Sequence, residues 1–228
     1  MSRDFVRYQA EHHPLAQTDR FESMEEYCLH LIHLKAYETA ATIGRGKAVL
    51  DFGCNNGYGT RIIALSGCRV VGVDVSEAGI AEARQLGNAQ NLSFLCTVGG
   101  TLPFEQGEFD VVTNFQVIEH VSNYGTYLAE INRVLKDDGM AMFATPNARI
   151  RLDPGMKPWY EFHVREFSAA ELRDLLCQWF PDVQVTGLFA AKELHEVEYA
   201  RVQRSRERAR SRIRCVKPLF HQRSLLRE

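Results

Sequence analysis

The sequence lacks the marks of a membrane-spanning, exported or disulfide-stabilised protein. None of its apolar runs approaches the roughly 20 residues that a membrane-spanning helix needs. The segment MSRDFVRYQAEHHP at the amino end contains no apolar core of the kind that a secretion signal needs. Six cysteines are present, but no two of them form a C-x-x-C pair. We therefore expect a cytoplasmic protein whose cysteines are reduced thiols.

A strong net charge is also absent, since the formal value is −2 for 228 residues. This argues against nucleic acid as a partner for the whole surface. The charge is unevenly spread, because residues 191–228 hold eleven Lys and Arg against five Asp and Glu. Such a basic tail on an acidic body predicts a separate role for the tail. We expect a helical or partly disordered segment that either contacts an anionic membrane surface peripherally or docks on the body.

Short apolar runs alternate with helical stretches through most of the chain. Five runs have the length of a buried parallel strand: Ala48–Phe52, Val70–Val73, Leu92–Leu95, Val111–Phe115 and Ala141–Ala144. Helical periodicity covers Glu25–Ile43 before the first run and Asn123–Leu135 before the last. The alternation predicts one α/β domain over residues 1–190, with its core at 37–189 and a doubly wound, mostly parallel sheet.

Two further elements are predicted after the fifth run. Ser168 and Glu171 have the spacing of a helix-starting capping box. We expect this helix to run to about Trp179. The segment Val183–Phe189 then has the alternating apolar pattern of a sixth strand.

A glycine-containing loop follows the first predicted strand. In VLDFGCNNGYGT the strand ends at Asp51 and the loop holds Gly53 and Gly57. Glycine lets the backbone turn sharply there and leaves room for a ligand. A P-loop would need Gly-Lys-Ser/Thr, which is absent, and a dinucleotide loop would need glycine at Asn55 and Tyr58. The pattern therefore favours a ligand without a pyrophosphate.

A second acid stands at the end of the next predicted strand. In RVVGVDVS, Asp74 follows Asp51 by 23 positions, where a carboxylate can accept hydrogen bonds from both hydroxyls of a ribose. Two acids at successive strand ends, with a glycine loop between them, make a specific arrangement. The competing interpretation is an α/β domain with ordinary loop turns and no ligand.

Together these motifs resemble those of class I S-adenosylmethionine-dependent methyltransferases. VLDFGCNNGYG is similar to the first motif of that family and VVGVDVS to the second, while DVVTNFQVIEHV and EINRVLKDDGMAMFATPN are similar to later strands. The similarity extends over roughly Tyr37 to Phe189 and is greatest to ubiquinone-biosynthesis and bacterial glycan or natural-product O-methyltransferases. It implies a Rossmann-like fold, S-adenosyl-L-methionine as cofactor, S-adenosyl-L-homocysteine as product, and a small-molecule or glycan acceptor.

The resemblance also implies which residues bind the cofactor. The glycine loop would pack against its methionine part, and Asp74 would bind the ribose. The backbone near Phe115 and Gln116 would meet the methionine amino group. The full set is Asp51, Gly53, Cys54, Asn55, Gly57, Tyr58, Asp74, Val75, Gly99, Phe115 and Gln116.

Two positions depart from the family pattern. Asn55 stands where the middle glycine of the first motif is usual, although Asn tolerates a positive φ better than most residues. Val98 stands where the family often has an Asp that touches the adenine amine. We expect the backbone of Gly99 to take over part of that contact.

Two histidines are candidates for catalytic proton transfer. Methyl transfer needs an aligned donor and acceptor, and a hydroxyl acceptor must also lose a proton. A histidine suits that task because its ordinary pKa is near neutrality. His163 lies in MKPWYEFHVREFS after the fifth strand, and His120 lies in VIEHV after the fourth. Glu119 could orient either histidine. In the alternative interpretation the segment of His163 only leads into the next helix, and His120 contacts substrate or starts a helix.

Other polar and aromatic residues have weaker signals. Trp159, Tyr160 and Arg165 flank the histidine of MKPWYEFHVREFS and would suit a sugar ring or an anionic group, or would simply pack as a lid. No metal site is predicted. His30 and His33 lie three apart, but neither a carboxylate nor a thiol accompanies them.

The sequence thus predicts an O-methyltransferase acting on a hydroxyl of a saccharide, lipid-linked or natural-product acceptor. One alternative keeps the cofactor and makes nitrogen or carbon the acceptor atom. Another alternative is a non-catalytic cofactor-binding scaffold that docks a partner through the tail. An RNA methyltransferase is disfavoured because the body is acidic and because the Asn/Asp-Pro-Pro-Tyr motif is absent.

Overall fold

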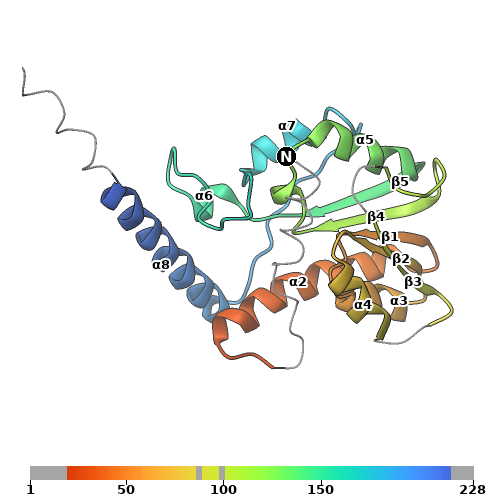
Figure 1. The fold of residues 1–228 in the computed structure, drawn as a ribbon, viewed down its shortest axis with the longest axis horizontal. Coiled ribbons are helices and arrows are strands. Elements are labelled where there is room, and N and C mark those ends of the chain that lie inside the picture. The colour runs from red at the N-terminus through yellow and green to blue at the C-terminus, as the bar shows by residue number, and fades with distance from the viewer. Residues whose placement is uncertain (1–19, 86–88, 98–100, 217–228) are drawn as a thin grey trace, which may run out of the picture.

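A computed structural model describes residues 20–85, 89–97 and 101–216, with side chains described as far as residue 211. Five strands form one sheet in the order β3-β2-β1-β4-β5 (Figure 1). They are β1 (Ala48–Phe52), β2 (Arg69–Asp74), β3 (Leu92–Cys96), β4 (Phe109–Phe115) and β5 (Leu135–Ala144). Every neighbouring pair is parallel. The predicted doubly wound parallel sheet is therefore confirmed.

Helices cover both faces of this sheet (Figure 1). They are α2 (Met24–Ile43), α3 (Tyr58–Leu65), α4 (Glu77–Gln85), α5 (Tyr124–Val134), α6 (Ala148–Arg151), α7 (Ala169–Leu176) and α8 (Lys192–Val216), with a 3-10 helix, η1 (Ile118–His120), after β4. Val49 of β1 packs with α2 and α3, whereas Leu50 packs with α5 and α7. Both are fully buried. Because the strand is covered on both sides, its sequence is continuously apolar.

Two predicted strand assignments need correction. β5 begins at Leu135 rather than Ala141, because Leu135 pairs with Phe109 ahead of a register shift in the ladder. The residues between are mostly polar, so no apolar run marked them. The predicted sixth strand, Val183–Phe189, is wrong, since that segment is irregular chain and Phe189 is 91% exposed. An apolar pattern forms a strand only where a neighbouring strand can hydrogen-bond to its backbone N–H and C=O groups. Among the described residues the sheet ends at β5, so this segment has no such neighbour.

The predicted capping box begins α7. Ser168 Oγ accepts a hydrogen bond from the backbone N–H of Glu171, and the Glu171 carboxylate accepts one from the backbone N–H of Ser168 at 2.9 Å. Hydrogen bonds from Ser168 and then from Arg165 lower the pKa of Glu171 to about 2. The helix ends at Leu176, three residues before the predicted Trp179, and the chain continues in turns.

The basic tail is helical as predicted, and its described part lies against the body. α8 runs beside α2 and α6 (Figure 1). Three of its arginines form ion pairs with the body: Arg204 with Glu25, and both Arg206 and Arg210 with Asp153. Val202 of α8 is buried. The prediction for the tail also covers residues 217–228, which lie outside the described residues.

The described residues bear on two expectations, the absence of a membrane-spanning helix and the reduced state of the cysteines. No helix in this part of the chain combines the length and the apolar character needed to cross a membrane. The cysteines whose side chains are described are free thiols, as expected: Cys28, Cys54, Cys68, Cys96 and Cys177.

Candidate active site

The loop between β1 and α3 turns through three left-handed residues. The φ angle is 91° at Gly53, 48° at Asn55 and 77° at Gly57. Glycine adopts this region at no steric cost, and Asn adopts it more readily than other residues. Asn55 thus has the positive φ that a glycine usually supplies at this position.

Neighbouring side chains also require two of these glycines. A Cβ on Gly53 would lie 2.2 Å from the side chain of Val117, and one on Gly57 would lie 2.6 Å from the ring of Phe94. Both distances are far below the roughly 3.5–4.0 Å of favourable carbon contacts. The loop therefore packs directly on the residue before η1, and the ends of β1 and β4 are brought together.

Asp74 ends β2 beside this loop. Its carboxylate accepts hydrogen bonds from the backbone N–H groups of Asn55 and Ser76, both at 2.8 Å. Each carboxylate oxygen can accept more than one hydrogen bond. The side chain is half-buried, so it can bind a ligand while it holds the loop in place.

Asp51, which the family resemblance implies is a cofactor-binding residue, is placed differently from Asp74. Its side chain is fully buried and accepts hydrogen bonds from the hydroxyls of Thr60 at 2.6 Å and Thr113 at 2.9 Å. Burial raises its pKa to about 6, although both threonines act in the opposite direction. Asp51 thus joins α3 to β4 beneath the loop.

The other residues predicted to bind a cofactor surround the loop, with one exception. Cys54 and Phe115 are buried, Tyr58 starts α3 and Val75 follows Asp74. Gln116 has a φ of 58°, so β4 ends in a second left-handed turn beside the loop. Gly99 lies outside the described residues.

The donor set at this loop fits S-adenosylmethionine. Residues 53–60 include no Lys or Arg, and the nearby carboxylate of Asp74 would repel a phosphate. The same carboxylate can accept hydrogen bonds from ribose hydroxyls. A cation such as a sulfonium is also compatible with it.

Two segments far apart in the sequence meet after β4. The backbone N–H of Val164 donates to the carbonyl of Glu119 at 2.8 Å, which holds the segment after α6 against η1. His120 Nδ1 lies 2.9 Å from the carbonyl oxygen of Phe162. The rings of His120 and His163 are consequently 4.9 Å apart, nearly perpendicular to each other. The structure brings the two predicted catalytic histidines together.

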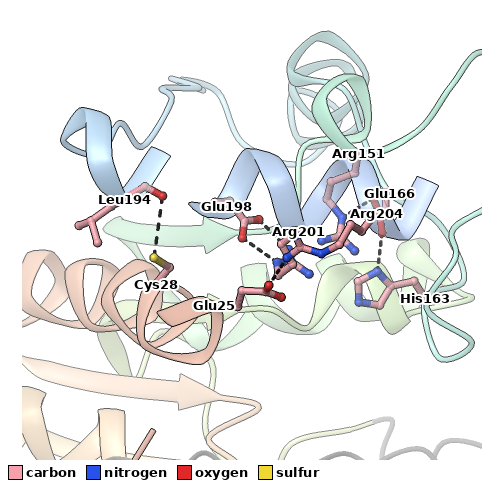
Figure 2. A network of polar contacts seen from close by, with 9 residues as sticks. All are labelled: Glu25, Cys28, Arg151, His163, Glu166, Leu194, Glu198, Arg201 and Arg204. Carbon is pink, nitrogen blue, oxygen red and sulfur yellow. Dashed lines mark hydrogen bonds and ion pairs between the residues drawn. The ribbon is translucent and has the colours of Figure 1, made fainter. Parts of the chain in front are cut away.

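His163 is held by a residue that sequence reasoning missed. Its Nδ1 lies 2.8 Å from Glu166 Oε1, and Arg151 binds the other carboxylate oxygen at 2.9 Å (Figure 2). Burial raises the pKa of Glu166, but the hydrogen bonds from His163 and Arg151 outweigh it and keep that pKa below its ordinary value. The H-x-x-E spacing was the available signal. It points one imidazole nitrogen at a carboxylate and leaves Nε2 for other contacts.

Glu119 is placed differently from its predicted role. It was expected to orient a histidine, but its carboxylate accepts a hydrogen bond from Thr145 at 2.9 Å. Its side chain is fully buried, and Oε1 has no hydrogen-bond partner among the described residues. Burial raises its pKa to about 7. Glu119, His120 and His163 nevertheless offer ligand atoms that all lie within 4.8 Å of one another.

The residues flanking His163 divide into two groups. The ring of Tyr160 packs edge-on against His163, with centroids 4.9 Å apart. Trp159 instead lies 4.4 Å from the guanidinium carbon of Arg151. Arg165 faces Phe167 at 4.9 Å and pairs with Glu171. Only Tyr160 therefore takes the predicted position around the histidine.

Comparison with known proteins relates this geometry to a family. The family described as "Methyltransferase domain" matches residues 50–143. A Mycobacterium tuberculosis protein named "Probable S-adenosylmethionine-dependent methyltransferase" is 36% identical over 168 residues, covering 73% of this chain and 60% of the relative. The chain thus spans about three fifths of that relative's length.

Two further proteins carry related names. The ubiquinone biosynthesis O-methyltransferase of Pseudomonas syringae pv. tomato is 34% identical over 105 residues, 45% of each chain. The crystal structure of geranyl diphosphate C-methyltransferase from Streptomyces coelicolor A3(2), with Mg²⁺, geranyl diphosphate and S-adenosyl-L-homocysteine, is similar with a TM-score of 0.57. Its identity is 16%, with 78% of each chain covered. This structural likeness concerns the fold alone.

Proposed function

We propose that the chain is a class I S-adenosylmethionine-dependent methyltransferase that transfers the cofactor's methyl group to a hydroxyl of a small acceptor, as its similarity to a methyltransferase family and to a named relative supports. The observation that carries this proposal is the pair His120 and His163, which lies after β4, where the Gly53 loop packs. A hydroxyl acceptor must lose a proton as it is methylated, and imidazole is suited to assist at neutral pH.

The chain's own residues have two tasks in this reaction. When bound, S-adenosylmethionine supplies the methyl group and a neutral thioether leaving group. Asp74 would hold the ribose hydroxyls, and the backbone of the loop and of Phe115 and Gln116 would hold the methionine part. The histidine pair would then assist the removal of the acceptor's proton, with Glu166 holding His163.

A groove near this site supports the proposed acceptor class. A groove of about 610 Å³ lies between the turn after α6 and α8, and its lining includes Lys157, Trp159 and Arg208. Trp159 contacts Arg151, which binds Glu166 beneath the histidine. An aromatic ring with two cations supports a saccharide, lipid-linked or natural-product acceptor that carries a ring or an anionic group.

The experiment that tests this function is product analysis with methyl-labelled S-adenosylmethionine and a panel of hydroxylated saccharides and lipid-linked acceptors. An O-methyl product is expected. An N- or C-methyl product would favour the alternative acceptor atom. Cofactor binding without turnover across the panel would favour a non-catalytic scaffold and contradict the proposal.

A peripheral membrane contact through α8 is a second candidate function. Each near-surface Lys or Arg contributes about 1 kcal/mol of attraction to anionic lipid, and Arg208 is exposed on α8. The ion pairs to Glu25 and Asp153 support docking on the body instead. Sedimentation with anionic vesicles, for the full chain and for a chain ending at Ala200, separates the two. Equal vesicle binding by both would exclude a membrane role of the tail.

A further inference from the structure

The cluster of Glu119, His120 and His163 has the composition of a metal centre. One ligand atom from each residue lies within 4.8 Å of the other two. Two imidazoles and one carboxylate are a donor set that binds Zn²⁺ and other first-row divalent ions and leaves positions open for substrate. Neither the sequence prediction nor the family comparisons assign a metal to these residues.

The contacts around the cluster are those of metal-binding histidines. A ligating histidine almost always donates its second ring N–H to a carboxylate or a backbone carbonyl. His163 has Glu166 at 2.8 Å from Nδ1, and His120 has the carbonyl oxygen of Phe162 at 2.9 Å from Nδ1. Because both contacts engage Nδ1, coordination by these histidines would use Nε2. Arg151 holds Glu166 in turn (Figure 2), so the outer partner is itself fixed.

An unsatisfied oxygen in the cluster is an independent observation. Glu119 is fully buried, yet its Oε1 has no hydrogen-bond partner among the described residues. Buried carboxylates are normally paired, hydrogen-bonded or bound to a metal. The other oxygen accepts a hydrogen bond from Thr145 at 2.9 Å. Carboxylates that bind metals are commonly oriented by such a hydrogen bond.

We infer that Glu119, His120 and His163 bind a divalent transition-metal ion of the zinc class. The inference rests on the proposed function and deepens it: His120 and His163 would assist loss of the acceptor's proton through the ion, which would hold the acceptor oxygen and lower the pKa of its hydroxyl, and not by taking the proton themselves. The oxygen–carbon bond would form as the carbon–sulfur bond breaks, with the electron pair going to sulfur and the hydroxyl proton to water. Zn²⁺ bonds of about 2.0–2.2 Å place tetrahedral ligand atoms roughly 3.3–3.6 Å apart, so small side-chain rotations close the cluster.

The test is calorimetric titration of chelator-treated protein with ZnCl₂, without cofactor or acceptor. We expect one Zn²⁺ per chain for the wild type. His163→Ala should weaken this binding by about 100-fold or more, and Glu166→Gln by about 10–100-fold, as for outer partners of known sites. His195→Ala removes an exposed histidine of α8 and should leave the affinity unchanged.

A measurement on the wild type alone guards against variants that fail to fold. Co²⁺ should produce visible absorption bands that one equivalent of Zn²⁺ removes and that Mg²⁺, which prefers oxygen ligands, does not. The inference is overturned if the wild type binds neither ion, or if His163→Ala and His195→Ala bind Zn²⁺ equally. Methyl transfer by protein that binds no metal would leave the proposed function standing alone. Zn²⁺ binding without methyl transfer to any acceptor would do the reverse.

Discussion

The loop after β1 and the segment around His163 reach the same edge of the sheet by different means. The loop relies on backbone conformation, with left-handed residues at Gly53, Asn55 and Gly57 and a single acid, Asp74, beside it. The His163 segment relies on side chains that hold one another in series, from Arg151 through Glu166. The first arrangement spans positions 53–74, while the second also brings His163 beside His120, which is 43 positions away in the sequence.

We expect the loop to determine cofactor affinity and the His163 segment to determine the rate of methyl transfer. A backbone-built loop can hold a constant cofactor with few side chains, so changes there should affect affinity. A chain of oriented side chains can place a proton-handling group accurately, so changes there should affect turnover. The comparison is wrong if variants on the two sides have the same kinetic signature.

The largest expected effect is on the His163 side. His163→Ala should lower the turnover number by about 10²-fold or more, since general acid–base assistance contributes 10²–10⁴-fold. Cofactor affinity, measured by calorimetry, should remain unchanged because Asp74 and the loop are untouched. The same experiment on His195→Ala, an exposed histidine, provides the control. Near-normal turnover of His163→Ala would assign the role to His120 or show that no proton acceptor is needed.

The loop side should show the opposite signature. Asp74→Ala removes a carboxylate that would accept hydrogen bonds from the ribose, costing about 1.5–3 kcal/mol of cofactor binding. Turnover at saturating cofactor should fall much less. Calorimetry with S-adenosylhomocysteine measures the affinity. An unchanged affinity would show that Asp74 only holds the loop through Asn55 and Ser76.

Sequence reasoning was accurate where the determinants are contiguous. The strand-loop-strand unit with Asn55 in a left-handed turn follows from local steric preference, and the capping box at Ser168 follows from a fixed spacing. It was inaccurate where the structure of a segment depends on contacts with a distant part of the chain. Val183–Phe189 was predicted as a strand but has no strand neighbour among the described residues. The pairing of Glu166 with His163 had a local signal in the H-x-x-E spacing, whereas the approach of this segment to Glu119 had none.

The orientation of Asp51 also depends on residues distant in the sequence, and it differs from that of Asp74. Asp74 is the last residue of β2 and Asp51 the last but one of β1, and Asp51 faces inward to Thr60 and Thr113. The family resemblance placed both acids among the cofactor-binding residues and assigned the ribose to Asp74 alone. The inward orientation of Asp51 is stabilised by the hydroxyls of Thr60 and Thr113, and Thr113 belongs to a different strand, β4.

A third prediction therefore concerns stability rather than affinity. Burial raises the pKa of Asp51 from 3.8 to about 6 in the folded state, so the folded protein binds this proton more tightly than the unfolded chain. The stabilisation is present below about pH 4 and is lost as pH rises through about 6. Two pKa units correspond to about 3 kcal/mol as an upper bound. Asp51→Asn should be more stable than wild type at pH 7.5 by a fraction of that value.

Urea unfolding at pH 5.0 and pH 7.5 provides the measurement for Asp51→Asn. The difference from wild type should be larger at pH 7.5 and should shrink toward pH 5.0. Cofactor affinity should change little, in contrast to Asp74→Ala. A strong loss of affinity would place Asp51 in the cofactor site and remove the distinction between the two acids.

The smallest expected effect concerns the helix caps on the two sides. Ser168 caps α7 directly after the His163 segment, whereas Ser23 caps α2 at an exposed position. Each Ser→Ala change removes a hydroxyl that accepts a backbone N–H, which costs about 1 kcal/mol of unfolding free energy. Ser168→Ala should also lower turnover a few-fold, because the same box anchors the chain that holds His163, while Ser23→Ala should not. Ser168→Thr keeps the cap and should restore both quantities. Equal turnover in Ser168→Ala and Ser23→Ala, at equal loss of stability, would mean that the His163 segment is held by Glu119 and Glu166 alone.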